Sequence, residues 1–394
     1  MQAERADALG GRCEAEATSV AGIDRAQVAL PGQLVATRAA SAGRPRMLIV
    51  SDTMPPDPNG IALITLHTAE LLSASFDVRV VGPLGAQFSS AISYSPIARL
   101  PFGTPDLHIP RPALRRMSRA VSLADRVVVH TPGPLGLAAL LFARRYGKHS
   151  TLFQHNDYPV LVKYGLPRTI AAPLLSRIAA SIDRWSVQAA SRVVSSSGIP
   201  TDCRRVLRLD PPRYELPPAR RDSGERPIIV AYHGRVSREK AVDAIVRAIH
   251  TADPGGRRLR FRIVGGGSQL RQVLALAALL GVSVEHVAWC DDPRRALAGT
   301  DIYVTASRTE TYSITTLEAL GCGLPIIARR VGNIPTYVTD NANGLLFDTD
   351  QELPQLIKVL MYDSELRGRM AKTARSSATS ESIWQQFASA SGGG

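Results

Sequence analysis

Short apolar segments rich in β-branched residues alternate with longer segments of helical periodicity along most of the chain. In the N-terminal half the apolar segments lie at residues 47–50, 77–83, 126–132 and 150–155, and helical sequence such as GLAALLFARRYG separates them. Apolar runs of this length are typical of buried strands. Strands that alternate with helices predict a parallel sheet covered by helices on both faces.

The same alternation restarts after a proline-rich interruption at residues 210–226, DPPRYELPPARRDSGER. Its prolines and charges prevent a long regular element, so we predict a linker between domains. Beyond it, PIIVAYHG, RFRIVGGG, VEHVAW, DIYVTAS and PIIARR repeat the strand pattern between helical segments. We therefore predict an α/β protein with two doubly wound, Rossmann-like domains, at residues 47–209 and 227–375. Ligands of such sheets bind beyond the carboxyl ends of the strands.

Composition limits the classes of protein that this chain can represent. Hydrophobic residues make up 45% of it, yet every apolar run is shorter than the roughly 18 residues that a membrane span needs. Residues 1–46 lack the basic start and apolar core of a secretory signal, so we expect a disordered leader and a cytoplasmic protein. The four cysteines are scattered singly, which favours neither a disulfide framework nor a zinc site.

The chain is strongly basic, with a formal net charge of +13. Such a charge suits polyanionic partners: nucleic acid, an anionic membrane surface or a phosphorylated substrate. One basic cluster, PRPALRRMSRAVS at residues 110–122, reads as a surface helix. Two interpretations stay open for it. The helix packs its apolar side on the sheet, or it attaches to anionic lipid at about 1 kcal/mol per basic residue.

The stretch ETYSITTLEALGCGLPIIARR carries two carboxylates, Glu310 and Glu318, with seven residues between them. It follows the strand DIYVTAS, so Glu310 is expected in the loop at the carboxyl edge and Glu318 near the first turns of a helix. Backbone N–H groups around Ser313, Ile314 and Thr315 would suit an anion such as phosphate. Carboxylates beside them can accept hydrogen bonds from sugar hydroxyls.

This stretch, together with HGRVSREKAVDAI, RIVGGGSQL and NGLLF in the same order, resembles the family 4 retaining glycosyltransferases of GT-B fold. The resemblance runs from about Met47 to Phe387, and RVVVHTPGPLGLAALLFARRYGKHSTLFQHNDYP looks like members that glycosylate lipids. It implies transfer of a hexose from a nucleotide diphosphate sugar to a hydroxyl, with retained configuration and an α-linked product. It also implies that no metal or other cofactor is needed, and that the acceptor is a lipid or lipid-linked, reached from the inner face of the cell membrane.

The resemblance also assigns roles to residues. It implies that Glu310 contacts the donor hexose and Glu318 the ribose hydroxyls. Arg235 and Lys240 match a cationic pair on the donor diphosphate, where they would stabilise the charge of the leaving group. His155 matches a histidine that lines the site near the reacting sugar. These assignments make His155, Arg235, Lys240 and Glu310 the expected catalytic residues.

Further matching positions are expected to bind the donor: Asn59, Gly60, Gly234, Gly266, Ser313, Ile314, Thr315 and Glu318. The chain departs from the family at several points: Asn59-Gly60 stands where a paired glycine is usual, and Tyr312-Ser313 replaces a common Phe-Gly. Ala241 replaces a glycine, and Thr336 replaces a common glutamate. ESIWQQF resembles the family's last helix, so residues 376–394 are expected to return to the N-terminal domain and to close in a flexible tail, SASGGG. Asp348-Thr349-Asp350 imitates a metal-binding pattern, but its place before QELPQLIKVL favours a helix cap.

Parts of the sequence are also compatible with other functions. A small soluble metabolite is the alternative to a lipid acceptor. A sugar-nucleotide epimerase of the same architecture would need a pair of acid and base groups, and the motifs offer no convincing pair beyond His155 and Glu310. A noncatalytic nucleotide-sugar-binding partner of an active transferase also stays open. Nucleic-acid binding would explain the net charge but not the order of the motifs, so no nucleic-acid partner is expected.

Overall fold

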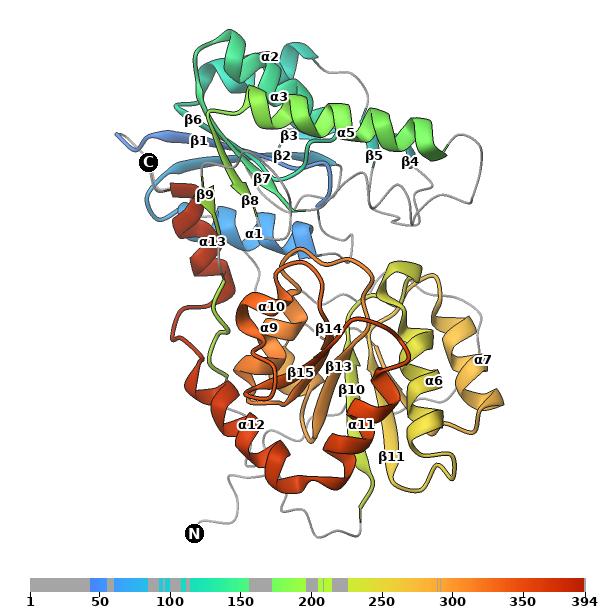
Figure 1. Cartoon of the computed structure of the whole chain (residues 1–394). Coiled ribbons are helices and arrows are strands. Elements are labelled where there is room, and N and C mark those ends of the chain that lie inside the picture. Colours follow the sequence, from blue (N-terminus) through green and yellow to red (C-terminus); the bar gives the residue numbers. More distant parts are fainter. Residues whose placement is uncertain are drawn as a thin grey trace, which may run out of the picture. The chain divides into compact units, whose positions relative to one another are not determined.

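The computed structural model describes the larger part of the chain, and the leader predicted at residues 1–46 lies outside it except for its last four residues. The described residues are 43–54, 60–83, 92–94, 96–99, 108–110, 114–155, 172–195, 205–207, 209–214, 226–288, 290 and 292–392. Parallel sheets with helices packed against them make up two α/β domains within these ranges (Figure 1). The predicted fold class is therefore confirmed.

The N-terminal sheet has the strand order β3-β2-β1-β6-β7-β8-β9 in the described part of the chain, and its neighbouring strands run parallel. Its strands are β1 (Arg46–Val50), β2 (Asp77–Pro83), β3 (Ile92–Tyr94), β6 (Arg126–Val129), β7 (His149–Gln154), β8 (Arg192–Ser195) and β9 (Arg205–Val206). Its helices are α1 (Gly60–Leu72), α2 (Leu114–Leu123), α3 (Pro134–Arg145) and α5 (Ala172–Ala189). A separate antiparallel ribbon joins β4 (Pro96–Arg99) to β5 (His108–Pro110).

The C-terminal sheet has the strand order β12-β11-β10-β13-β14-β15 and is also parallel. Its strands are β10 (Ile228–His233), β11 (Leu259–Val264), β12 (Val284–Val287), β13 (Ile302–Thr305), β14 (Ile326–Arg329) and β15 (Gly344–Phe347). The accompanying helices are the short 3-10 turn η2 (Arg238–Lys240), α6 (Val242–Ala252), α7 (Leu270–Leu279), α8 (Pro293–Ala296), α9 (Ile314–Gly321), α10 (Ile334–Tyr337), α11 (Leu353–Tyr362) and α12 (Ser364–Ser376).

In each sheet the chain adds strands first toward one edge and then, from a central strand, toward the other edge. In the C-terminal sheet this happens between β10 and β13, which pair through Val230 and Ile302. The loops that leave these two strands therefore lie side by side at the carboxyl edge, which is where ligands of doubly wound sheets bind. In the N-terminal sheet the corresponding strands are β1 and β6.

The last helix, α13 (Ile383–Gly392), packs against α1 of the N-terminal domain. The Trp384 ring stacks on His67 with centroids 4.7 Å apart, and the Gln386 amide exchanges hydrogen bonds with the backbone of Asp210. Residues 389–392, expected in a flexible tail, instead belong to this helix, because Ala390 and Ser391 are buried there. None of the helices that the structure describes is long and apolar enough to cross a membrane.

Asp52, in the loop after β1, caps helix α3 from outside the helix. Its buried carboxylate accepts hydrogen bonds from Thr131 Oγ1 and from the Leu135 backbone N–H, both at 2.7 Å. A side chain at Gly133 would clash, since an ideal Cβ there would lie 2.5 Å from Asp52 Cγ. Burial raises the pKa of Asp52 to about 6, although these hydrogen bonds oppose the shift. Folding therefore holds the proton of this group more tightly than the unfolded chain does.

Asp52→Asn is expected to change how stability depends on pH. Because the pKa of Asp52 is raised from 3.8 to about 6, its stabilising contribution is complete below pH 3.8 and is lost as the pH rises through 6. Relative to the variant, the wild type should lose about 2 kcal/mol of unfolding free energy between pH 4 and pH 7. Urea unfolding at both pH values measures this difference.

Asp125→Asn is the matched control for that measurement. The backbone N–H of Arg46, followed by its side chain, lowers the pKa of Asp125, so this carboxylate stabilises above the unfolded pKa and loses its effect as the pH falls. The control should therefore show the opposite sign, at lower pH. A pH-independent difference between wild type and Asp52→Asn would contradict the role given to Asp52.

Ala241, at the junction of η2 and α6, has a left-handed backbone with φ of 49°. This conformation costs an L-residue about 1–2 kcal/mol, and glycine adopts it without that cost. Ala241 is one of the positions where the resembled family has a glycine, so the departure seen in the sequence coincides with strain in the backbone.

Ala241→Gly is expected to be much better tolerated than Ala248→Gly, a buried control on the same helix. Ala248→Gly should lower the unfolding free energy by about 1 kcal/mol, because glycine is a poor helix former. Release of the left-handed strain should make Ala241→Gly about 1–2 kcal/mol more stable than that control. Chemical denaturation of the two variants measures the gap, and equal losses would show that Ala241 is unstrained.

Candidate active site at the carboxyl edge of the C-terminal sheet

The loops that leave β10 and β11 are hydrogen-bonded to each other. The N–H of Gly234 donates to the Val264 carbonyl at 2.9 Å, and the N–H of Val236 donates to the Gly266 carbonyl at 2.8 Å. Gly234 and Gly266, both expected to bind the donor, thus lie in two loops fixed against one another. Open space surrounds the position that a Cβ of Gly266 would take.

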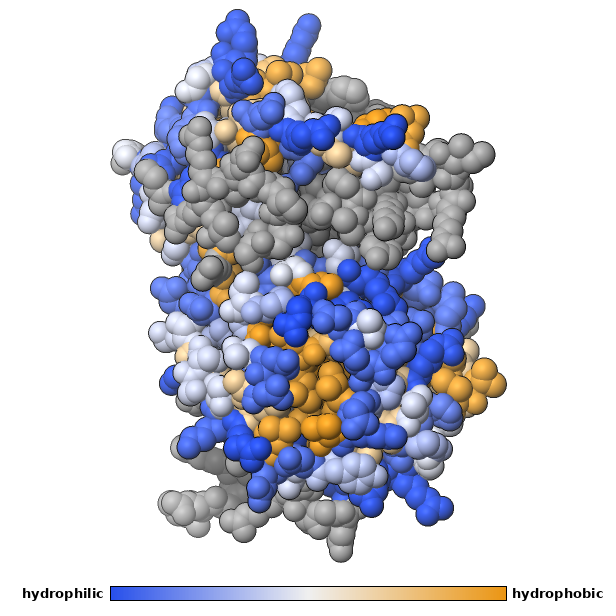
Figure 2. Space-filling model, in the orientation of Figure 1, coloured by the Kyte–Doolittle hydropathy of each residue, from blue (hydrophilic) through white to orange (hydrophobic). Residues whose placement is uncertain are grey.

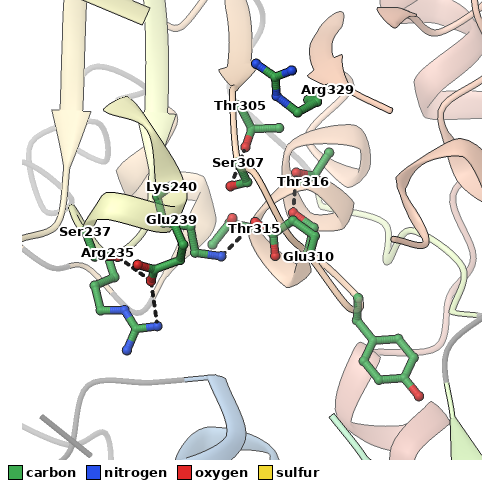
Figure 3. A network of polar contacts seen from close by, with 12 residues as sticks. Arg235, Ser237, Glu239, Lys240, Thr305, Ser307, Glu310, Thr315, Thr316 and Arg329 are labelled. Carbon is green, nitrogen blue, oxygen red and sulfur yellow. Dashed lines mark hydrogen bonds and ion pairs between the residues drawn. The ribbon is translucent and has the colours of Figure 1, made fainter. Parts of the chain in front are cut away.

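Lys240 and Glu310 form an ion pair at this edge (Figure 3). Lys240 lies on η2 after β10, Glu310 lies in the loop after β13, and Lys240 Nζ donates to Glu310 Oε1 at 2.7 Å. Their side chains are 20% and 11% exposed. The structure therefore joins two expected catalytic residues that stand 70 positions apart in the sequence.

Arg235 is held by a carboxylate that the sequence analysis missed. Arg235 Nη2 donates to Glu239 Oε1 at 3.2 Å, and Ser237 Oγ donates to the same oxygen (Figure 3). The Glu239 carbonyl accepts from the N–H of Arg308, which ties η2 to the loop after β13. Arg235 lies in the loop before η2 and Glu239 within it, with the extended Ser237 between them, so no local sequence pattern announced this pair.

Helix α9 begins at a strained residue. Ser313 precedes the helix with a left-handed φ of 45°, and its Oγ lies 2.8 Å from Thr316 Oγ1. The Tyr303 hydroxyl, from β13, donates to Thr315 Oγ1 at 2.9 Å. Ile314 reaches Gly60 at the start of α1, where its Cδ1 lies 3.6 Å from the position of an ideal Cβ. The expected donor-binding residues Gly60, Ser313, Ile314 and Thr315 thus lie near one helix terminus.

Glu318 lies one turn further along α9 and is buried. Burial, followed by the negative charge of Glu318, raises the pKa of both Tyr214 and Cys322. Tyr214 also donates its backbone N–H to the Gly321 carbonyl at 3.1 Å. Asn59, the remaining expected donor contact, lies outside the described residues.

Gly332 packs directly against the backbone of the loop that carries Glu310. It is not among the residues predicted from the sequence. An ideal Cβ on Gly332 would lie 1.9 Å from the Glu310 carbonyl oxygen, and its φ of +55° is left-handed. The next residue, Asn333, donates its N–H to the Thr311 carbonyl at 3.1 Å. Only glycine permits this close approach. The backbone at Glu310 and Thr311 is therefore held by Gly332 and by the hydrogen bond from Asn333.

His155 lies at the carboxyl end of β7 with its ring buried. Its Nε2 lies 2.9 Å from Nδ1 of His130, at the end of the neighbouring strand β6. The ring also contacts Tyr312, which stands two residues after Glu310, with centroids 6.2 Å apart. Burial lowers the pKa of both histidines, that of His130 to about 3, so both rings are neutral.

The prediction that Asp348 or Asp350 caps α11 is wrong. Asp350 instead pairs with the guanidinium groups of Arg308 and Arg329, and Glu352 accepts from the N–H and the hydroxyl of Thr349. The buried Arg329 needs a carboxylate, which explains why the acid turns inward. In the part of the chain that the structure describes, no group of three or more His, Cys, Asp and Glu side chains could hold a metal ion.

Comparison with known proteins gives this site a family. Residues 217–377 match the family model described as "Glycosyl transferases group 1". A "GDP-mannose-dependent alpha-mannosyltransferase" of Mycobacterium tuberculosis (strain CDC 1551 / Oshkosh) is 29% identical over 303 residues, which is 71% of this chain and 74% of the relative. A "D-inositol 3-phosphate glycosyltransferase" of Nocardia farcinica (strain IFM 10152) is 39% identical over 131 residues, 30% of this chain and 29% of that relative.

Solved structures agree on the architecture. Sucrose-phosphate synthase from Thermosynechococcus elongatus superposes with a TM-score of 0.68 at 18% identity, covering 88% of this chain and 96% of that one. WaaG, a glycosyltransferase involved in lipopolysaccharide biosynthesis, gives 0.65 at 19% identity, covering 88% and 100%. Anabaena HepE in complex with UDP-glucose gives 0.66 at 17%, covering 87% and 98%. These likenesses establish the GT-B fold, and within it residues 217–377 match the glycosyl transferases group 1 domain.

Proposed function

We propose that the protein is a retaining hexosyltransferase that moves a hexose from a nucleotide diphosphate sugar to a hydroxyl acceptor and leaves an α-glycoside. The observation that carries this proposal is the Lys240–Glu310 pair with Arg235 beside it, at the carboxyl edge of the family domain. Two cations there suit a diphosphate, and a carboxylate there suits the hydroxyls of a hexose.

The two cations carry the electrostatic part of the reaction. Negative charge grows on the diphosphate as it leaves, and cations already held in place lower the barrier without reorganising. Glu239 holds Arg235, and Glu310 holds Lys240, before any ligand arrives. When a diphosphate binds, Lys240 turns toward it, and Glu310 is freed to accept a hydrogen bond from the hexose. This arrangement assigns the neutralising role to side chains, so no metal is required.

The remaining donor contacts follow from helix α9. Its N-terminus, at Ser313 and Ile314, offers backbone N–H groups and a positive helix dipole to the phosphates. Glu318, buried on the same helix, is assigned to the ribose hydroxyls. The structures of Anabaena HepE in complex with UDP and with UDP-glucose support a nucleotide sugar as the donor here.

Retention of configuration requires attack on the face from which the diphosphate leaves. The bond between the anomeric carbon and the phosphate oxygen breaks, and the acceptor oxygen bonds to that carbon from the same side. The proton of the acceptor hydroxyl passes to an oxygen of the leaving phosphate. The protein's contribution is to hold the charges and to exclude water that would hydrolyse the donor.

A lipid or lipid-linked acceptor at an anionic membrane is supported by one face of the N-terminal domain. Leu174, Ile178 and Ile182 recur every fourth residue on α5 and are exposed, Leu174 by 61%. Of these three side chains, Ile182 borders a shallow apolar hollow of about 410 Å³, which Leu141 of α3 also lines. Arginines flank this stripe on α5 at positions 177 and 184, so apolar and cationic groups are mixed as a membrane contact requires (Figure 2).

The basic helix at residues 110–122 fits the packing interpretation in its described part. On α2, Met117 and Val121 are buried, while Leu114 and the arginines 115, 116 and 119 lie toward solvent or at the edge of the buried face. We therefore assign membrane contact to α5 first, and α2 adds positive charge. A soluble metabolite is the acceptor if this face binds no lipid.

Ile178→Glu is expected to weaken binding to vesicles that contain phosphatidylglycerol, by about tenfold. Burial of an isoleucine side chain contributes about 1.5–3 kcal/mol, and the new carboxylate is repelled by the anionic surface. Co-sedimentation with these vesicles measures the loss. Leu279→Glu on α7, where the side chain is 81% exposed, is the control and should bind like the wild type. Equal losses in both variants, or no vesicle binding by the wild type, would exclude this face.

Lys240→Met and Glu310→Gln are expected to change nucleotide binding in opposite directions. Lys240→Met should weaken binding of UDP or GDP in EDTA by about 10- to 100-fold, because a charged hydrogen bond is lost. Glu310→Gln should strengthen it by about tenfold, because Lys240 is released from its partner. The same Glu310→Gln change should slow sugar transfer at least about 100-fold.

Isothermal calorimetry and a transfer assay measure these two effects. Lys372→Met, an exposed lysine on α12, is the control and should leave binding unchanged. If neither nucleotide bound to the wild type, the donor site proposed here would be wrong. Tighter binding by both Lys240→Met and Glu310→Gln would show instead that Lys240 faces away from the diphosphate.

A further inference from the structure

Two buried histidines meet at the carboxyl edge of the N-terminal sheet. His130 directly follows β6, and His155 directly follows β7. The two strands are parallel neighbours, with Val129 opposite Leu152. The rings are 0% and 3% exposed and stack at 5.2 Å with an interplanar angle of 15°. His130 Nδ1 lies 2.9 Å from His155 Nε2, so one of these atoms donates to the other.

The number of ring N–H groups limits where the protons of the two histidines can be. Both rings are neutral, so each carries one N–H. If His130 donates through Nδ1, its Nε2 is bare and the free N–H of the pair is on His155 Nδ1. If His155 donates through Nε2, the free N–H is on His130 Nε2. In the described structure neither His130 Nε2 nor His155 Nδ1 has a hydrogen-bond partner.

The surroundings decide between these two arrangements. His130 is fully enclosed and stacks on Phe153, so an N–H at its Nε2 would stay buried without an acceptor, which is unfavourable. His155 lies at the strand end and contacts Tyr312, in the loop that carries Glu310. His155 Nδ1 is itself buried in the described structure, but it belongs to the ring beside the Glu310 loop, so a ligand that shifts this loop on binding can give an N–H there its acceptor.

We propose that His130 is a positioning residue: its Nδ1–H donates to His155 Nε2 and so fixes His155 as an Nδ1–H donor toward an oxygen of the bound nucleotide sugar. The inference deepens the proposed function and rests on it. His155 then acts as a neutral hydrogen-bond donor and not as a base, which agrees with a reaction in which the leaving phosphate takes the acceptor's proton. A histidine's second nitrogen commonly sets the role of the first in this way.

The ring nitrogens of the wild-type protein report the arrangement directly. Nitrogen-15 NMR of the full chain with labelled histidine, free and with UDP or GDP bound, distinguishes protonated from bare ring nitrogens. The expected spectrum has His155 protonated at Nδ1 and bare at Nε2. A His155 that is protonated at Nε2 in both states would overturn the proposal.

Substitutions at His130 separate positioning from packing. His130→Leu removes the donor, whereas His130→Asn keeps an amide N–H near the place of Nδ1. We expect His130→Leu to lower kcat about tenfold or more with unchanged nucleotide binding, and His130→Asn to stay within about threefold of the wild type. Turnover is followed as release of nucleoside diphosphate from UDP-glucose or GDP-mannose. Phe153→Leu is the packing control, because it alters the same ring cluster without touching the hydrogen bond.

Each outcome bears on a separate claim. Full activity in His130→Leu, or equal losses in His130→Leu and Phe153→Leu, would refute the positioning role. Rescue by His130→Asn together with a changed His155 spectrum in His130→Leu would support it. A wild-type protein that released nucleotide from neither donor would contradict the proposed function, while its ring spectrum would still decide the direction of the hydrogen bond.

Discussion

Buried charge at the carboxyl edge of the C-terminal sheet must be paired before a ligand arrives, and the site is built around that requirement. An isolated cation in a partly buried position is costly, so Lys240 and Arg235 each need a carboxylate. Glu310 is the carboxylate for Lys240. The two meet because β10 and β13 are neighbours in the sheet, which places η2 beside the loop that carries Glu310. Glu239 supplies the other from within the same turn. The free protein thus holds its cations in place by interactions that a diphosphate can replace.

Strained backbone accompanies this pairing on both of the loops involved. Ala241 follows Lys240 and Ser313 follows the Glu310 loop, and both adopt left-handed φ values that glycine would adopt more easily. Both stand where the resembled family has glycine. The side chains of Ala241 and Ser313 limit the conformations open to each loop. Gly332 packs closely against the carbonyl of Glu310 and restricts the second loop further. The site therefore exchanges some stability for restricted loops, a common property of functional sites.

The fold was predictable from the sequence, because strand and helix periods alternate clearly and the motifs keep their order. Glu310 and Lys240 were predictable for the same reason, since each follows a recognisable strand. The contacts of Asp52 and Asp350 depend on residues distant in the sequence, so no local sequence pattern predicts them. Asp52 caps a helix through Leu135, 83 residues further along, and Asp350 turns away from the helix beside it to reach the buried Arg329. Glu239 is a third example, because it reaches Arg235 across the extended Ser237 rather than along a helix.

The two sheets place different chemistry at corresponding edges. At the C-terminal edge, opposite charges face each other as Lys240–Glu310 and Arg235–Glu239, which suits a doubly charged leaving group. At the N-terminal edge, Asp52 is committed to the cap of α3, and the histidine pair is held neutral by burial. Under the proposed function, growing charge meets cations on the donor side, while the opposite side offers neutral hydrogen bonds. A sugar hydroxyl needs no more than that, and a charged group there would compete with the diphosphate for the cations.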